Sequence, residues 1–349
     1  MVSTAATPPA TAGRILIIGA TGFMGQFMTK ASLGLGRSTY LLLRPGSLTP
    51  SKAAIVKSFQ DRGAKVIHGV INDKELMVKI LKDYEIDVVI SLVGGGNLMD
   101  QRTLVDAIKS VKTVKRFLPS EFGHDTDRAN PVEPGLTMYK EKRLVRRLIE
   151  ESGIPYTYIC CNSIASWPYH DNCHPSKVPP PVDQFLIYGD GSVKAYFVDG
   201  NDIGKFTMKA IDDIRTRNKN VHFRPPSNCY SINELASLWE KIIGRKIPRA
   251  IVSAEDLLAA AAENCIPRSI VAAFTHDIFI NGCQINFSIE GPNDIEIGTL
   301  YPDEKFRCLE ECFKDFVPMT HDMNVHVGTT EINNNRKSLV EVAPITAMG

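Results

Sequence analysis

A glycine-rich turn near the N-terminus constrains the fold of this chain more than any other feature. Residues 14–19 are predicted to form a buried strand and residues 23–33 an amphipathic helix, with glycines at positions 19, 22 and 25 at the junction. Glycines at this spacing allow a tight turn and let backbone N–H groups approach a pyrophosphate, at which the positive end of the helix also points. A plain tight turn is the alternative, but the strand-turn-helix context favours a dinucleotide site. The residues expected to hold the cofactor here are Gly19, Thr21, Gly22, Phe23, Met24 and Gly25.

Short β-branched runs alternate with amphipathic segments through the first half of the chain. Strands are predicted at residues 14–19, 38–43, 65–68, 86–92, 115–119 and 156–161. Helices are predicted at residues 23–33, 51–61, 73–83, 98–112 and 138–152. Alternation at this spacing implies right-handed crossovers and a parallel sheet with helices on both faces. We therefore assign the chain to the α/β class, with a Rossmann-type, doubly wound sheet.

The second half of the chain lacks this clean alternation. It carries prolines at 179–181, a glycine-containing hairpin signal at 188–197 and helices predicted at 232–244, 254–262 and 267–279. We expect a dinucleotide-binding domain at residues 13–161 and a smaller α+β domain at 162–316 that mainly binds substrate. At least one later element is expected to return to the sheet. Residues 1–12 are predicted to be a disordered leader and residues 317–349 a flexible tail, because neither shows periodicity.

Charge balance and cysteine usage exclude several classes of protein. Forty basic and thirty-nine acidic side chains leave a net charge of +1, which indicates no nucleic-acid or anionic-membrane partner. No apolar run approaches the ~20 residues of a membrane helix. The eight cysteines include no Cys-x-x-Cys pair, which favours reduced thiols in the cytoplasm and indicates no metal site. The oligomeric state stays open.

The end of the second predicted strand distinguishes between the two nicotinamide dinucleotides. NAD enzymes place Asp or Glu there to bind the ribose 2′-hydroxyl, whereas this chain has Arg44 and no acid until Asp61. An arginine pairs with a 2′-phosphate, and Lys52 adds a second cation, so NADPH is the expected cofactor. Gly94, after the fourth strand, is expected to border the cofactor where it crosses the sheet. The alternatives are an ordinary solvated lysine at 52 and a loop with turn glycines at 94–96.

The helix predicted at residues 138–152 lacks the Tyr-x-x-x-Lys pair of ordinary short-chain reductases. Arg143, not lysine, stands four residues after Tyr139. The same helix offers Lys142 as a candidate catalytic group.

The neighbouring charges set Lys142 apart. Arg146 and Arg147 each have an acid four residues later and are predicted to form ion pairs, Arg146 with Glu150 and Arg147 with Glu151. Lys142 has no acid at either such position and has Arg146 on its own face. A lysine in this setting can lose its proton near neutral pH if it is partly buried. The alternative is a solvated lysine on a basic helix.

His124 is the second candidate for proton transfer. It lies just past the C-terminal end of the fifth predicted strand, and ligands of open α/β sheets bind in the crevice at that edge. A loop histidine that hydrogen-bonds Asp125 or Asp127 is the alternative.

Together these residues resemble the isoflavone reductase-like group of plant NADPH-dependent reductases. The glycine-rich turn, Arg44, the segment at 116–123 and Lys142 match the group, whose members carry a lysine in place of the short-chain Tyr/Lys pair. His124, the segment at 159–162 and the Thr-His-Asp string at 275–277 narrow the resemblance to its leucoanthocyanidin reductase branch. The resemblance covers roughly residues 13–316.

The resemblance implies NADPH-dependent reduction of a flavan-3,4-diol to a catechin-type flavan-3-ol. It implies that Lys142 takes the phenolic proton, that His124 protonates the departing 4-hydroxyl and that a quinone methide accepts hydride at carbon 4. Asn162 and Lys142 join the expected cofactor contacts. Expected contacts with this small flavonoid are His124, Tyr139, Ser163, Phe274, His276 and the loop at 166–169, although simple packing is the alternative for each.

Two other functions stay open from the sequence. The chain could be a phenylcoumaran benzylic ether, pinoresinol–lariciresinol or isoflavone reductase with the same fold and lysine. It could instead be a non-catalytic NADP-sensing regulator, but such sensors lack the lysine. Cys160 and Cys161 are expected to pack as small apolar side chains.

Overall fold

A parallel sheet forms the centre of the computed structural model, which describes residues 13–165 and 181–317. The predicted leader, the tail from 318 and the loop at 166–169 lie outside the described residues. Five parallel strands pair in the order β3-β2-β1-β4-β5, and strand order reverses between β1 and β4. The strands are β1 (Ile15–Ile18), β2 (Thr39–Leu43), β3 (Lys65–His68), β4 (Val88–Ser91) and β5 (Arg116–Leu118). The predicted Rossmann-type sheet is thus confirmed.

Three further parallel strands continue this sheet. The backbone N–H of Phe117 in β5 donates to Pro155 O at 2.8 Å, just before β6 (Thr157–Cys160). Strand β6 pairs with β10 (Lys219–His222), and β10 pairs with β13 (Asp294–Glu296). Strands from the second half of the chain therefore lie beside those of the first half.

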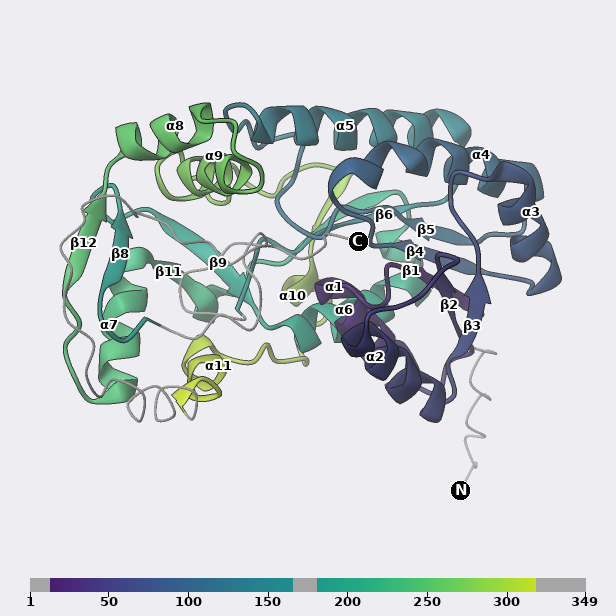
Figure 1. The fold of residues 1–349 in the computed structure, drawn as a ribbon, viewed down its shortest axis with the longest axis horizontal. Helices are drawn as coiled ribbons and strands as arrows, with labels where there is room; N and C mark the ends of the chain where they lie inside the picture. Colours follow the sequence, from purple (N-terminus) through teal and green to yellow (C-terminus); the bar gives the residue numbers. More distant parts are fainter. Residues whose placement is uncertain (1–12, 166–180, 318–349) are drawn as a thin grey trace, which may run out of the picture.

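Helices cover both faces of the sheet (Figure 1). One face packs on α1 (Phe23–Gly34), α2 (Pro50–Asp61) and α6 (Gly200–Asp212). The other packs on α3 (Lys74–Asp83), α4 (Gln101–Val111) and α5 (Gly135–Ser152), with the 3₁₀ turn η1 (Gly95–Asp100) before α4. Because side chains alternate along a strand, Ile15 and Ile17 enter the first core and Leu16 and Ile18 the second.

The second half builds its own apolar core beside the sheet (Figure 1). Two small sheets contribute: β8 (Phe185–Tyr188) parallel to β12 (Arg249–Val252), and β9 (Lys194–Val198) between β7 (Ser163–Ile164) and β11 (Cys229–Ser231). The helices of this core are α7 (Ile232–Ile243), α8 (Ala254–Ala262), α9 (Arg268–Phe279) and α11 (Leu309–Lys314). The short helix α10 (Ile297–Leu300) packs on the first core instead, and the 3₁₀ turns are η2 (Ile214–Thr216) and η3 (Pro226–Asn228). In the described part of the chain, no helix combines the length and apolarity that crossing a membrane requires.

The hairpin predicted at residues 188–197 is wrong. The turn exists, with Gly189 and Gly191 at φ +60° and +69° and the N–H of Gly191 bonded to Tyr188 O at 3.0 Å. The two flanking strands then diverge, because β8 pairs with β12 while β9 pairs with β7 and β11. Long-range partners, which the local pattern does not encode, decided the pairing.

Candidate active site

The glycine-rich turn adopts a geometry that only glycine allows at two of its positions. Gly19 has φ +83°, and a Cβ there would lie 2.6 Å from Leu92 O. A Cβ on Gly25 would lie 2.0 Å from Gly19 O, because the first turn of α1 packs directly on β1. Gly22 occupies the N-cap of α1 and offers no side chain to cap it. The N-terminal N–H groups of α1 are therefore left for a ligand or water.

A cavity of about 540 Å³ opens at the C-terminal edge of the sheet, beside this turn. It is lined from the ends of β1, β2 and β4 and from the segments that follow them, at the point where strand order reverses. Open α/β sheets bind dinucleotides at this location. Five of the predicted cofactor residues line it: Gly19, Thr21, Arg44, Lys52 and Gly94.

The cavity wall beside β2 is cationic. Arg44 follows β2 directly, and Lys52 lies in the first turn of α2, where its N–H donates to Thr49 Oγ1 at 3.4 Å. Sequence reasoning missed Thr49, although a threonine before Pro50 is a helix-start signal. The only acidic side chain among the described lining residues is Asp100. Two cations and few acids suit a phosphate better than a ribose hydroxyl.

Lys142 lies on α5, against the loop that follows β5. Its Nζ donates to the backbone carbonyl of Glu121 at 2.8 Å, and the side chain is half-buried. The bond ties the lysine to the loop at the sheet's C-terminal edge, so the alternative of a freely solvated lysine does not describe it. Its catalytic role and its contact with the cofactor stay predictions.

Three predicted site residues form one buried aromatic group. His124 Nδ1 hydrogen-bonds the Tyr139 hydroxyl, and the Tyr139 ring stacks on Phe274 with centroids 4.8 Å apart. The His124 and Phe274 rings meet edge to face at 6.3 Å. The alternative partners of His124, Asp125 and Asp127, bond arginines instead. The loop, α5 and α9 thus converge at this point.

Asn162 and Ser163 lie beside the loop, at the end of β6. The N–H of Asn162 donates to Gly123 O at 3.0 Å and its Nδ2 to Phe223 O at 2.9 Å, so it holds neighbouring segments together. Ser163 Oγ accepts from Gln284 Nε2 at 2.7 Å, a buried partner that sequence reasoning missed. The predicted contacts of Asn162 with cofactor and of Ser163 with substrate stay predictions.

His276 lies on α9, two residues after Phe274. Its side chain is 9% exposed, and its Nδ1 has no hydrogen-bond partner among the described residues. A buried imidazole nitrogen without a partner costs free energy unless a ligand or water satisfies it. The observation supports the predicted substrate contact.

The ion pair predicted between Arg146 and Glu150 is wrong. Arg146 is fully buried and its guanidinium bonds three carboxylates of the loop after β5: Glu121 at 2.7 Å, Asp125 at 2.8 Å and Asp127 at 3.1 Å. Burial alone would lower the pKa of Arg146, but the charges of Glu121 and Asp125 outweigh it and raise the pKa well above its usual value. Arg146 faces the sheet, so the loop supplies its counter-charges and its helix does not.

Arg147 also departs from the expected pairing. It bonds Asp127 at 2.6 Å and Glu150 at 3.1 Å, in place of Glu151. The half-exposed guanidinium therefore joins the helix surface to the same loop.

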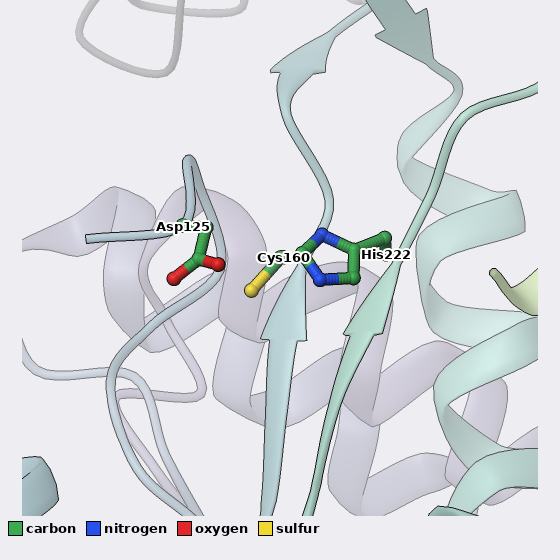
Figure 2. Close-up of side chains that lie close together, drawn as sticks. All are labelled: Asp125, Cys160 and His222. Carbon is green, nitrogen blue, oxygen red and sulfur yellow. The ribbon is translucent and has the colours of Figure 1, made fainter. Parts of the chain in front are cut away.

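Beneath the loop, Asp125, Cys160 and His222 bring their ligand-type atoms within 4.8 Å of one another (Figure 2). Such a set could hold a cation, but each group already has a partner. Arg146 donates to Asp125 at 2.8 Å and to Cys160 Sγ at 3.8 Å, and His222 Nε2 bonds Asp294 at 2.9 Å. We assign the cluster to this ion-pair network, because a guanidinium already neutralises the carboxylate.

The two adjacent cysteines are fully buried. Burial raises the pKa of Cys161 to about 12, although the nearby charge of Lys142 opposes the rise. Burial also raises the pKa of the Cys160 thiol well above its usual value. Both thiols stay protonated at neutral pH. Cys161 packs in the apolar core, as expected from the sequence, whereas Cys160 contacts the Arg146 guanidinium instead.

Comparison with known proteins shows what the chain is similar to. The NmrA-like family matches residues 11–313. Leucoanthocyanidin reductase from Desmodium uncinatum is 72% identical over 347 residues, which cover 99% of this chain and 91% of that relative. A phenylcoumaran benzylic ether reductase from Ginkgo biloba is 44% identical, over 87% of this chain and 99% of that relative. The solved binary complex of Vitis vinifera leucoanthocyanidin reductase with NADPH has a TM-score of 0.84 at 65% identity, covering 88% of this chain and 100% of that one.

Proposed function

The chain belongs to the NmrA-like family, and we propose that it acts as a leucoanthocyanidin reductase, reducing a flavan-3,4-diol to a flavan-3-ol with NADPH. One observation of the site carries the proposal. The loop after β5 presents buried His124 and offers Lys142 the Glu121 carbonyl, at the same sheet edge as the cationic cavity. An acid and a base can therefore act on one substrate beside a bound dinucleotide.

The cavity residues fit NADPH. The close approach of Gly25 to Gly19 leaves the backbone of the turn open to a pyrophosphate. Arg44 and Lys52 give the cavity wall two cations, which would bind the 2′-phosphate. NADPH, when bound, supplies the hydride that carbon 4 of the substrate accepts.

The protein's own groups move the protons. Lys142 accepts the proton of the phenolic 7-hydroxyl, and electrons flow through the ring to break the bond between carbon 4 and its hydroxyl. His124 donates a proton to that hydroxyl, which leaves as water, and the quinone methide accepts hydride at carbon 4. Lys142 then returns its proton to the phenolate oxygen, and a solvent proton restores His124. One diol, one NADPH and one proton yield one flavan-3-ol, one NADP⁺ and one water. Each group must reach its atom within about 3 Å, so the substrate spans the site between Lys142 and His124.

Product chromatography tests the function. Purified protein with NADPH and a flavan-3,4-diol should yield the flavan-3-ol, with little reduction of a dibenzylic lignan or a phenylcoumaran supplied in its place. Faster reduction of either rival substrate would assign the chain to a benzylic ether or lignan reductase. No turnover of any of them, with NADPH still bound, would favour a sensing role.

The role of Lys142 is tested by Lys142→Ala. We expect kcat to fall by about 10² or more, the range for loss of a general base, while the variant still binds NADPH. Lys140→Ala is the matched control, because Lys140 lies on the same helix, is exposed and pairs with Glu133. Intact turnover in Lys142→Ala would refute the mechanism, and lost NADPH binding would assign the lysine a structural role.

We also propose a cytoplasmic location. The cysteines of the described residues are all free thiols, which suits a reducing compartment. Fluorescence of a tagged full chain in plant cells tests it, and secretion of the fusion would contradict it.

A further inference from the structure

Four cationic side chains of α5 bind the loop that follows β5. Lys142 Nζ donates to the carbonyl of residue 121 at 2.8 Å. Arg143 donates to the carbonyls of residues 126 and 129, each at 2.6 Å. Arg146 and Arg147 bind carboxylates of the same loop. The loop that carries His124 is therefore fixed by the helix that carries Lys142.

Glu121 accepts hydrogen bonds from two side chains of α5. Its backbone oxygen accepts from Lys142, and its Oε2 accepts from Arg146 Nη2 at 2.7 Å, one helical turn further along α5. The side chains of Glu121 and Arg146 are 1% and 0% exposed. A buried, charge-assisted bond of this kind is strong and leaves little room for movement. It therefore fixes the peptide group whose oxygen contacts the lysine.

We propose that Glu121, anchored by Arg146, is a positioning residue that aims the amine of Lys142 at the substrate through its own backbone carbonyl. The inference rests on the function proposed above, in which Lys142 is the base. A neutral amine has two N–H groups and one lone pair. With one N–H held by a fixed oxygen, the lone pair is confined to the two remaining staggered positions on nitrogen, whereas an unheld lysine side chain samples many rotamers.

The hydrogen bonds of the Glu121 carboxylate allow position to be separated from charge. Both of its bonds, from Arg146 at 2.7 Å and from Thr126 at 3.4 Å, end on Oε2, and Oε1 bonds no described residue. In Glu121→Gln the amide oxygen can take the place of Oε2, so the anchor survives while the charge is lost. In Glu121→Asp the charge survives, but the side chain is one methylene shorter and pulls the peptide toward Arg146.

The test compares these two variants of the full-length protein with wild type. If position matters, kcat of Glu121→Gln stays within about twofold, and kcat of Glu121→Asp falls about tenfold or more, since displacements near 1 Å have costs of this order. KM for NADPH should stay within about twofold in both, because the cofactor cavity is untouched. Arg147→Gln is the control: it removes a loop contact that does not involve Glu121, and its kcat should stay within about twofold.

Three results would overturn the proposal. The first is a Glu121→Asp enzyme with wild-type kcat, and the second is a Glu121→Gln enzyme that loses as much as Glu121→Asp, which would assign the effect to charge. The third is a Glu121→Asp protein that melts below the assay temperature or loses NADPH affinity in step with kcat, which would assign the pair to folding alone. Failure of the proposed function is recognised separately, because wild type itself would then leave the diol unchanged.

Discussion

At the scale of single residues, the site depends on charges that meet defined partners. Arg44 is exposed and projects from the end of β2 into the cavity wall, so its charge is available to a ligand. Arg146 has the opposite setting, buried and neutralised by three loop carboxylates. The first arginine is therefore suited to recognition and the second to holding structure.

Arg44→Ala should discriminate between the two dinucleotides. A charge-assisted bond to the 2′-phosphate contributes about 1.5–3 kcal/mol, so Kd for NADPH should rise about 10- to 100-fold. Kd for NADH, which lacks that phosphate, should change less than about threefold. Quenching of protein fluorescence measures both. Arg62→Ala, at the exposed C-cap of α2 and outside the cavity, is the control. Equal losses for both dinucleotides would remove the 2′-phosphate argument.

At the scale of elements, the packing of α1 on β1 forms the floor of the cofactor site. The contact is close because Gly25 faces Gly19 across the turn with no side chain between them. The other end of the same helix is open, and a Cβ on Gly34 would meet no atom within 4 Å. Substitution of Gly25 therefore tests the close contact, and substitution of Gly34 in the same helix is its control.

Gly25→Ala should push α1 away from β1. We expect the free energy of unfolding to fall by about 3 kcal/mol, the upper range for overpacking, and NADPH affinity to fall at least about tenfold. Gly34→Ala should leave binding unchanged and raise stability by about 0.5 kcal/mol through reduced chain entropy. Thermal melting and NADPH titration measure the two effects. A Gly25→Ala protein that binds NADPH normally would show that the close contact is not needed.

Elements and their order were predictable because their signals are local. The glycine-rich turn, the cation after β2 and the missing Tyr-x-x-x-Lys pair all lie within short segments. Contacts between residues far apart in the sequence were not predictable in the same way. The i,i+4 spacing on the helix predicted an ion pair between Arg146 and Glu150. In the structure Arg146 is buried and pairs with carboxylates of the loop after β5 instead. The hairpin at 188–197 failed for the same reason, and Gln284 became visible only as the partner of Ser163.

At the scale of the whole molecule, the last strand of the sheet depends on one carboxylate. Asp294 in β13 accepts from Arg128 at 2.6 Å, His222 at 2.9 Å and Asn220 at 3.1 Å. These partners come from the loop after β5 and from β10, so the carboxylate ties the late strand to the loop that carries His124. Burial would raise the pKa of Asp294, but the bonds from His222, Asn220 and Arg128 outweigh it and hold the pKa below its ordinary 3.8.

Asp294→Asn should therefore lower the stability of the protein by an amount that depends on pH. The variant keeps the shape and loses the charge, and we expect the free energy of unfolding in urea at pH 7 to fall by about 2 kcal/mol. Because the folded pKa is lower than the unfolded one, the contribution of the carboxylate is fully present above the unfolded value. It is lost as the pH falls through the lowered folded pKa, so the gap between wild type and variant should narrow below about pH 4. Asp303→Asn, an exposed carboxylate with no bond to a described residue, should change stability by less than about 0.5 kcal/mol. A gap that is absent at pH 7, or that widens in acid, would mean that β13 is held by its backbone pairing with β10 and not by this carboxylate.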